Sequence, residues 1–183
     1  MRGHPGCPGT SEGVPGLLVC PTLAGGVVVR PTVSCVFVCH DGAGRVLLAR
    51  RGAGARDEPG TWDCGAGALE FGETFEAAVA REVAEEYGVR PLAIERIGVR
   101  NVLRGDPVAS HWVAVVFAVQ VEPGRVRIGE PHKFDALAWC APDALPEPLH
   151  SQCGESLALF ASCGSPATPV RGVRCRSVHR PPG

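Results

Sequence analysis

The chain has 183 residues, which suits one domain with short tails, and 45% of them are apolar, as in ordinary soluble globular proteins. A formal net charge of −1 argues against a protein whose overall charge attracts nucleic acid or a membrane surface. No stretch reaches the roughly 18 consecutive apolar residues of a membrane helix. The N-terminal residues also lack the pattern of a secretory signal. We therefore expect a soluble, cytoplasmic protein.

Two terminal segments, residues 1–24 and 164–183, are rich in glycine and proline and show no hydrophobic period. This composition predicts a disordered N-terminal arm and a disordered C-terminal tail around a domain that covers residues 25–163. The tail carries four arginines and no acidic residue. The tail could contact RNA or another anionic surface, or it could simply be solvated; the sequence leaves both alternatives open.

The chain contains nine cysteines, and none of them forms a C-x-x-C pair. A zinc site of the usual spacing is therefore not expected. The odd number of cysteines and the expected cytoplasmic location favour free thiols over disulfides.

Strand and helix patterns alternate between the tails. Short runs rich in β-branched and apolar residues predict strands. These are 32–40, 45–51, 62–65, 93–103, 111–121 and 137–140. Apolar residues at helical spacing predict helices over 74–87 and 151–162. The order predicts an α+β domain, in which a mixed sheet packs against helices in an α-β-α arrangement.

The helix over 74–87 carries the most informative pattern. Thr74 is a suitable N-cap, and Gly88 is placed to end the helix. Glu82, Glu85 and Glu86 lie at positions i, i+3 and i+4, which puts their carboxylates on one helical face. Like charges at this spacing repel, whereas hard divalent cations require clustered oxygen ligands. The spacing therefore indicates a metal site.

Residues around this acidic face add to the pattern. Arg81 can orient one carboxylate through a forked pair. Glu73 lies just before the helix, where its charge suits the helix dipole, and it can brace the preceding loop. That loop, residues 64–68, is rich in glycine, so its backbone can approach the carboxylates and offer a carbonyl ligand.

The stretch from Gly67 to Val89 resembles the signature of the Nudix family, G-x5-E-x7-R-E-U-x-E-E-x-G-U, where U is aliphatic. It matches every fixed position, and a chance match is on the order of one in ten million. The matching residues are Gly67, Glu73, Arg81, Glu82, Val83, Glu85, Glu86, Gly88 and Val89.

The resemblance implies an α-β-α sandwich that hydrolyses a nucleoside diphosphate linked to another group, X. It implies Mg²⁺, or Mn²⁺, bound by Glu82, Glu85 and Glu86 and by a loop carbonyl, which by position is that of Ala66. Family members usually have Pro-Gly-Gly before the signature, whereas this chain has Gly-Ala-Gly at positions 65–67. This difference bears on the loop geometry and on metal affinity.

The similarity extends over about residues 32–160. The piece GALEFGE, the strand that starts at His111-Trp112, and residues 129–134 followed by Trp139 resemble the MutT-like branch, which degrades nucleoside triphosphates. By position, Glu130 is a candidate to complete the metal site, and a solvated loop acid is the alternative. Arg51, and less directly Arg50, are candidate substrate contacts, and surface arginines are the alternative. His111 and Trp112 are expected to pack. His132 and Phe134 are further candidates for the pocket.

The mechanism that the resemblance implies uses metal to activate water, with Glu82 as the general base and Arg81 holding it. Glu130 is the reserve base. The expected substrates are nucleoside triphosphates, which would give the monophosphate and pyrophosphate. ADP-ribose or another nucleotide sugar is the alternative substrate, and a nucleotide sensor without catalysis, or an RNA-associated module, is the alternative of another class. Many family members are dimers, which leaves a homodimer open, although no interface pattern is visible.

Overall fold

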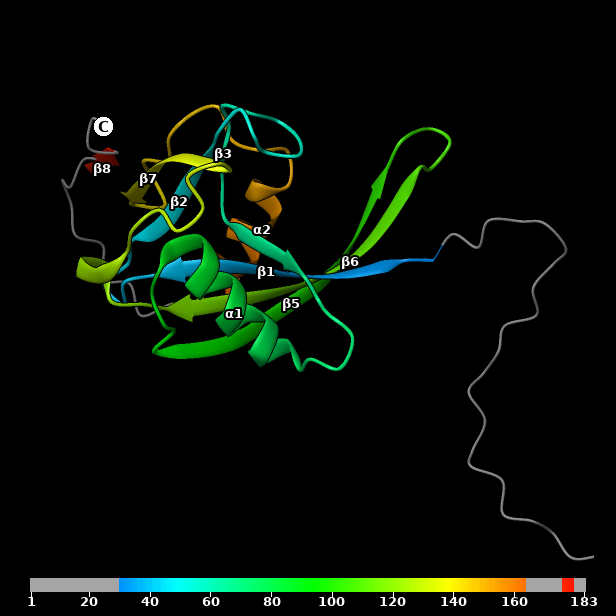
Figure 1. Ribbon diagram of the computed structural model, residues 1–183, viewed down its shortest axis with the longest axis horizontal. Coiled ribbons are helices and arrows are strands. Elements are labelled where there is room, and N and C mark those ends of the chain that lie inside the picture. The colour runs from blue at the N-terminus through cyan, green and yellow to red at the C-terminus, as the bar shows by residue number, and fades with distance from the viewer. Residues whose placement is uncertain (1–29, 164–175, 180–183) are drawn as a thin grey trace, which may run out of the picture. The chain divides into compact units, whose positions relative to one another are not determined.

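The computed structural model describes residues 30–163 and 176–179 (Figure 1). The predicted N-terminal arm, residues 1–24, lies outside these residues, as does most of the predicted C-terminal tail. The described part forms one sheet of eight strands, together with two α-helices and a 3-10 turn, η1. The strands are β1 (Thr32–His40), β2 (Val46–Arg51), β3 (Trp62–Asp63), β4 (Gly65–Ala68), β5 (Ala93–Arg104), β6 (Ser110–Gln120), β7 (Phe134–Cys140) and β8 (Arg176–His179). The helical elements are α1 (Phe75–Tyr87), η1 (Pro123–Arg125) and α2 (Cys153–Ser162).

The sheet is mixed, as the sequence predicts. Its strand order is β5-β6-β1-β2-β7-β8, with β3 paired to β2 and β4 paired to β1. β1 and β6 run parallel over their full common length, and every other pair is antiparallel. β1 and β2 share only the pair His40 and Val46, because β4 takes the neighbouring position along the rest of β1. β1 is therefore the central strand of the sheet on which the helices pack.

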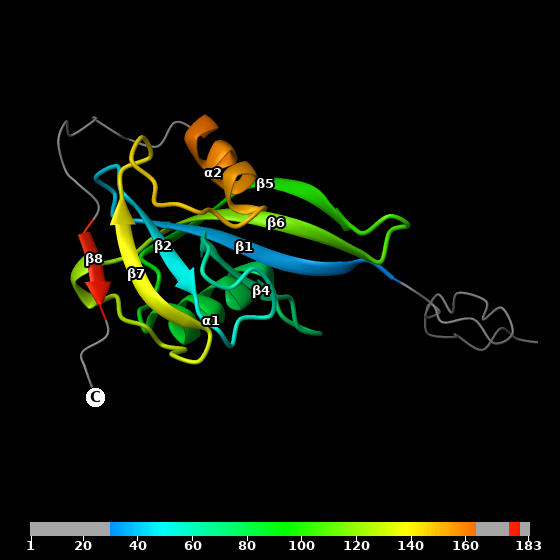
Figure 2. The same cartoon turned by 90° about the horizontal axis from the view of Figure 1, so that it is seen from above.

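The two helices cover opposite faces of the sheet, which confirms the α-β-α arrangement (Figure 2). Alternate residues of β1 explain this, because successive side chains of a strand point to opposite faces. Phe37 and Cys39 belong to the core under α1, whereas Val36 and Val38 belong to the core under α2. A strand that is apolar on both faces, as the sequence of β1 predicts, suits a sheet covered on both sides.

Both ends of α1 are fixed by local interactions that the sequence predicts. The Thr74 hydroxyl accepts a hydrogen bond from the backbone N–H of Ala77 at 3.2 Å. Gly88 adopts a left-handed conformation with φ of 61° and donates its N–H to the Ala84 carbonyl. Val79, Val83 and Tyr87 are fully buried against the sheet. This seating fixes the rotation of the helix, and hence the direction of its acidic face.

Two strands differ from the predicted pattern. β4 forms within the glycine-rich segment expected to be a loop, because its small residues can pair with β1 from Ser34 to Phe37. β8 forms within the segment 164–183 expected to be disordered, and its four residues pair with β7. Apolar periodicity is absent from both strands, so the sequence pattern does not reveal them.

Candidate active site

The three signature carboxylates on α1 differ in their exposure to solvent. Glu82 and Glu86 are buried, with exposed fractions of 8% and 3%, whereas half of the Glu85 side chain is exposed. Glu82 and Glu86 point from α1 toward β4, the strand that precedes the helix in the sequence. The predicted acidic face therefore divides into a buried part against the sheet and a part that faces solvent.

Glycines in β4 allow this approach. A Cβ on Gly67 would lie 1.9 Å from Cδ of Glu82, and a Cβ on Gly65 would lie 2.6 Å from Oε2 of Glu86. Contacts this short cannot exist, so a side chain at Gly67 would displace the Glu82 carboxylate. A side chain at Gly65 would displace the ring of Phe37, whose Cε2 would lie at 2.0 Å, as well as the Glu86 carboxylate. Ala66, between them, is exposed to solvent. The sequence Gly-Ala-Gly therefore keeps both close approaches that the carboxylates need.

Arg81 links the loop before α1 to the carboxylates. Its guanidinium donates to both oxygens of Glu73, at 2.8 and 2.9 Å. Its Nη1 donates to Glu82 Oε1 at 2.6 Å, and its Nη2 also donates to the carbonyl of Ala68. The forked pair is thus made with Glu73, and the contact with Glu82 uses the remaining nitrogen. Glu73 braces the loop further by accepting from the N–H of Glu70 at 3.1 Å.

Burial shifts the pKa values of the two inner carboxylates upward. Desolvation raises the pKa of Glu82, although its hydrogen bond with Arg81 opposes this shift. Desolvation raises the pKa of Glu86 well above its ordinary value, and the nearby charges of Glu82 and Glu130 raise it further. In contrast, the hydrogen bonds from Arg81 lower the pKa of Glu73 to about 2.

A loop after η1 brings a fourth carboxylate to this group. The N–H of Gly129 donates to the carbonyl of Glu86 at 2.8 Å, which holds the loop against the C-terminal end of α1. Glu130 follows directly and accepts a hydrogen bond from Lys133 at 2.8 Å. Burial lowers the pKa of Lys133, but this hydrogen bond and the charges of Glu130, Glu86 and Glu82 outweigh it and raise the pKa. Glu130 therefore lies near enough to Glu86 for its charge to raise the pKa of that carboxyl.

The donor set fits a hard divalent cation. Oε2 of Glu86 is buried and has no hydrogen-bond partner among the described residues. A buried carboxylate oxygen without a partner is unfavourable, and repulsion between neighbouring carboxylates adds to the cost. A divalent cation offsets both effects because it prefers clustered oxygen ligands. The carboxylates of α1 and of Glu130 provide such oxygens beside β4.

A cleft of about 560 Å³ lies beside Glu86 and is bordered by the sheet, by the start of α2 and by loops that connect the strands. At one end it is bordered by Ala66, Gly67 and Glu86. Positive and aromatic side chains border it elsewhere, namely Arg51, Arg56, Arg100, Arg104, Trp112, His132, Lys133 and Phe134. A volume of this size suits a nucleotide-sized ligand.

Arg51 and Arg50 are placed differently with respect to the cleft. Arg51 borders it and is bound by Asp57, through both the carboxylate and the backbone carbonyl, with Asp63 at 3.6 Å. Arg50 is 46% exposed and forms a forked pair with Asp135. It is absent from the residues that border the cleft within the described chain.

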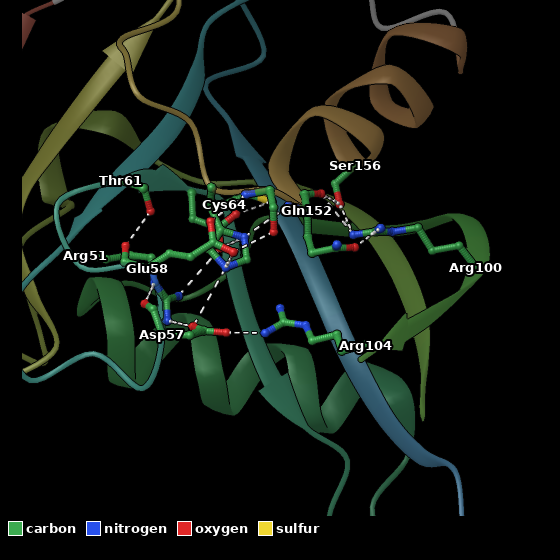
Figure 3. Close-up of polar contacts among 12 residues, drawn as sticks. Arg51, Asp57, Glu58, Thr61, Cys64, Arg100, Arg104, Gln152 and Ser156 are labelled. Atoms are coloured by element: carbon green, nitrogen blue, oxygen red, sulfur yellow. Dashed lines mark hydrogen bonds and ion pairs between the residues drawn. The ribbon is translucent and has the colours of Figure 1, made fainter. Parts of the chain in front are cut away.

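Several residues of the cleft carry no signal in the sequence. Asp57 joins Arg51 to Arg104 across the cleft, and Arg100 donates to Gln152 and Ser156 at the start of α2 (Figure 3). Isolated arginines in an arginine-rich chain do not stand out as candidates. Only the pairing of β5 with β6 and the docking of α2 bring these residues to one place.

A family model described as "NUDIX domain" matches residues 28–160. The chain belongs to the Nudix family. A MutT-like protein of Streptomyces ambofaciens is 38% identical over 117 residues, which are 63% of this chain and 66% of that protein. An RNA pyrophosphohydrolase of Gluconobacter oxydans is 30% identical over 147 residues, which are 72% of this chain and 81% of that protein.

A solved Nudix structure agrees with the fold. The crystal structure of a MutT NUDIX hydrolase from Burkholderia pseudomallei superposes with a TM-score of 0.64 at 32% identity, covering 71% of this chain and 98% of that one. These relatives identify the chain as a Nudix hydrolase of the pyrophosphatase type, an enzyme. Nudix hydrolases use divalent metal ions, in agreement with the donor set on α1. Among the described residues, no helix has the length and apolar character to span a membrane.

Proposed function

We propose that this Nudix hydrolase converts nucleoside or deoxynucleoside triphosphates into the monophosphate and pyrophosphate, with Mg²⁺ as its metal ion. The observation that carries the proposal is the position of the buried carboxylates of Glu82 and Glu86. They lie against glycines of β4, and Glu86 borders a cleft that is also bordered by four arginines and Lys133, together with Asp57 and Asp63.

In this proposal the metal ligands are oxygens from three places in the fold. Glu82, Glu85 and Glu86 supply carboxylates from α1, Ala66 supplies its backbone carbonyl from β4, and Glu130 supplies a carboxylate from the loop before β7. When bound at these oxygens, Mg²⁺ or Mn²⁺ neutralises charge that develops on the phosphate oxygens. Oε2 of Glu86 supports the assignment because it lacks another partner among the described residues.

Glu82 is the proposed general base, which accepts a proton from the attacking water. Its burial raises its pKa, so it binds a proton more readily than an exposed glutamate does. Arg81 is a positioning residue, because its Nη1 holds Oε1 of Glu82 at 2.6 Å while Glu73 fixes the rest of the guanidinium. Glu130 remains the reserve base, since it borders Glu86 and is held by Lys133.

Positive side chains of the cleft are proposed to bind the triphosphate. Arg51 has its guanidinium oriented by Asp57 and borders the same cleft as Glu86. An arginine that is already oriented loses less entropy when it binds a phosphate. Arg50, paired with Asp135 outside the cleft, remains the weaker candidate.

A substrate panel tests this proposal. The purified chain is incubated with Mg²⁺ and nucleoside triphosphates, oxidised nucleotides, ADP-ribose, NADH, dinucleoside polyphosphates and 5′-triphosphate RNA, and the products are identified. Release of pyrophosphate and monophosphate, fastest with free triphosphates, would support it. Faster cleavage of ADP-ribose would instead identify a nucleotide-sugar pyrophosphatase, and no cleavage of any compound would indicate a nucleotide sensor.

Triphosphate at the 5′ end of RNA is the second candidate substrate. It presents the same diphosphate linkage, and one relative is named an RNA pyrophosphohydrolase. Four arginines in residues 164–183, without a neighbouring acid, would suit a polyanion. Competition between a free triphosphate and 5′-triphosphate RNA for the enzyme separates the two candidates.

A further inference from the structure

A second group of side chains of the types that bind metal ions lies at the cleft, on other elements than the carboxylates of α1. It consists of Asp63 from β3, Cys64 from the link between β3 and β4, and Cys153 at the start of α2. One carboxylate oxygen of Asp63 and the two sulfur atoms all lie within 4.8 Å of one another, and all three residues are buried. The Cys64 sulfur lies 3.7 Å from Oδ1 of Asp63. Two ligands of one tetrahedral zinc ion are about 3.5–3.8 Å apart, given Zn–S and Zn–O bonds of roughly 2.3 and 2.1 Å.

The group is held by backbone contacts that join β3 to the start of α2. The N–H of His150 donates to the carbonyl of Trp62 at 2.9 Å, and the N–H of Cys153 donates to the carbonyl of His150 at 3.0 Å. These bonds fix the two cysteines near each other although they lie far apart in the sequence. Ligands that are already held close together bind a metal without a large ordering cost.

His150 lies against the carboxylate of this group. Its side chain is almost fully buried, and its Nδ1 lies 3.3 Å from Oδ2 of Asp63. The same Nδ1 accepts a hydrogen bond from the N–H of Gln152 at 3.1 Å. Oδ1 of Asp63 is then left on the side of Cys64. Because this Nδ1 accepts from Gln152, it does not donate to Asp63, and the cation that faces Oδ2 of Asp63 is Arg51, with Nη1 at 3.6 Å.

A path to the group leads through the cleft. Asp63, Cys64 and Ser156 border the cleft, whereas Cys153 is not among the residues that border it (Figure 3 shows Cys64, Ser156 and Gln152). An ion held by three protein ligands would therefore have one remaining position toward the cleft, open to water.

We propose that Asp63, Cys64 and Cys153 form a second metal site for a thiophilic divalent cation such as Zn²⁺. The ligand chemistry separates it from the site on α1, because two sulfurs select zinc over magnesium, whereas a set of oxygens selects magnesium. Both thiols lose their protons on binding. The bound ion would connect α2 to the link between β3 and β4, and so it would stabilise the fold. This proposal is independent of the proposed function.

Titration of the metal-free, reduced full chain with Co²⁺ tests the proposal. Cobalt bound by thiolate gives a charge-transfer absorption that cobalt bound by oxygens alone does not give. We expect one equivalent of thiolate-bound cobalt in the wild type and in Glu85→Gln. Cys64→Ser and Cys153→Ser should each weaken this binding at least tenfold, because each removes one of only three ligands.

Cys39→Ser and Cys163→Ser are the matched controls, one at a buried cysteine and one at an exposed cysteine outside the group. Both should bind cobalt as the wild type does. Absence of the absorption in the wild type, or its full retention in Cys64→Ser and Cys153→Ser, would overturn the proposal.

A crystal of the wild type grown with Zn²⁺ covers the case in which a serine variant does not fold. An anomalous difference peak between the three side chains would support the proposal. A peak only at other residues, or no peak, would overturn it.

Discussion

Gly67 lies so close to Glu82 that a Cβ on the glycine would be 1.9 Å from Cδ of the glutamate. Gly67→Ala must therefore move either β4 or the side chain that we propose as the general base. We expect turnover to fall about a hundredfold, because a displacement near 1 Å at reacting groups costs that much. We also expect the free energy of unfolding to fall by about 1–3 kcal/mol, because the added methyl group overpacks this contact. Steady-state rates and thermal unfolding measure the two effects.

Gly124→Ala is the control for this substitution. Gly124 lies in η1, and its φ is not in the positive range that disfavours side chains. A Cβ at this position would meet nothing within 4 Å. Its rate and its stability should match those of the wild type. A Gly67→Ala enzyme with wild-type turnover would show that the close approach of Glu82 to β4 is not needed for catalysis.

Glu86→Gln separates metal binding from stability. The substitution keeps the shape of the side chain but removes a buried negative charge whose Oε2 lacks a partner among the described residues. Without metal, we expect the variant to be at least as stable as the wild type, because the cost of burying the charge disappears. With Mg²⁺, we expect turnover to drop at least about a hundredfold and the metal-induced rise in melting temperature to vanish.

Glu85→Gln should also lose turnover, whereas Glu76→Gln, an exposed acid in the first turn of α1, should not. Measuring melting curves with and without Mg²⁺ beside activity tells a folding defect from a binding defect. Wild-type turnover in both Glu85→Gln and Glu86→Gln would remove the basis for the metal assignment.

The ion pair between Glu73 and Arg81 makes stability depend on pH in the acid range. The folded protein lowers the pKa of Glu73 from 4.5 to about 2. A group whose pKa is lowered by folding stabilises the fold fully above its unfolded pKa, and this contribution is lost as the pH falls through the folded value. The stabilisation should thus be constant above pH 4.5 and decrease between pH 4.5 and about 2.

Denaturant unfolding of the wild type and Glu73→Gln at several pH values checks this expectation. The difference between their unfolding free energies should be largest above pH 4.5 and should shrink toward pH 2. High salt should reduce the difference at every pH, since the pair is partly exposed. A difference that grows on acidification would contradict the assigned direction of the pKa shift.

Much of the fold follows from the sequence because its signals are local. The caps of α1 at Thr74 and Gly88 and the apolar runs of β1 and β6 are confirmed at their predicted places. β4 is not visible in this way, because a run of glycine and alanine has low strand propensity and pairs only when β1 offers an edge. The carboxylate group of α1 is predictable for the same reason as the caps, since its acidic residues lie within two turns of one helix.

The rest of the site depends on contacts between distant segments. Asp57 contacts Arg51 and Arg104, and the latter lies 47 positions away along the chain. Asp63, Cys64 and Cys153 come together only because α2 docks beside β3. Their spacing in the sequence does not indicate a zinc site, because the usual signal is two cysteines close together in the chain.

Arg51 and Arg50 are neighbours in the sequence but differ in their access to the cleft, which makes them a matched pair. If Arg51 binds the triphosphate, Arg51→Ala should raise KM about tenfold or more, as expected when one charge-assisted contact worth about 1.5–3 kcal/mol is lost. Arg50→Ala should have a smaller effect, because Arg50 pairs with Asp135 outside the cleft.

Arg125→Ala serves as the control, since this arginine lies on η1 and is largely exposed. Initial rates over a range of triphosphate concentrations separate KM from kcat. Equal effects of Arg51→Ala and Arg50→Ala on KM would mean that access to the cleft does not decide which arginine binds substrate.

Removal of residues 165–183 tests whether the C-terminal segment takes part in catalysis. The segment includes β8, which pairs with Ala136–Trp139 of β7 at the edge of the sheet. The carboxylates of α1 lie against β4, on the opposite side of β2 from this edge in the strand order. We therefore expect turnover of free triphosphates to stay within about twofold of the full chain. We also expect a modest loss of thermal stability, because each ladder hydrogen bond contributes only about 0.5–1.5 kcal/mol. A large fall in kcat for free triphosphates would show that the segment reaches the active site, whereas a loss confined to 5′-triphosphate RNA would assign it to the binding of a polyanion.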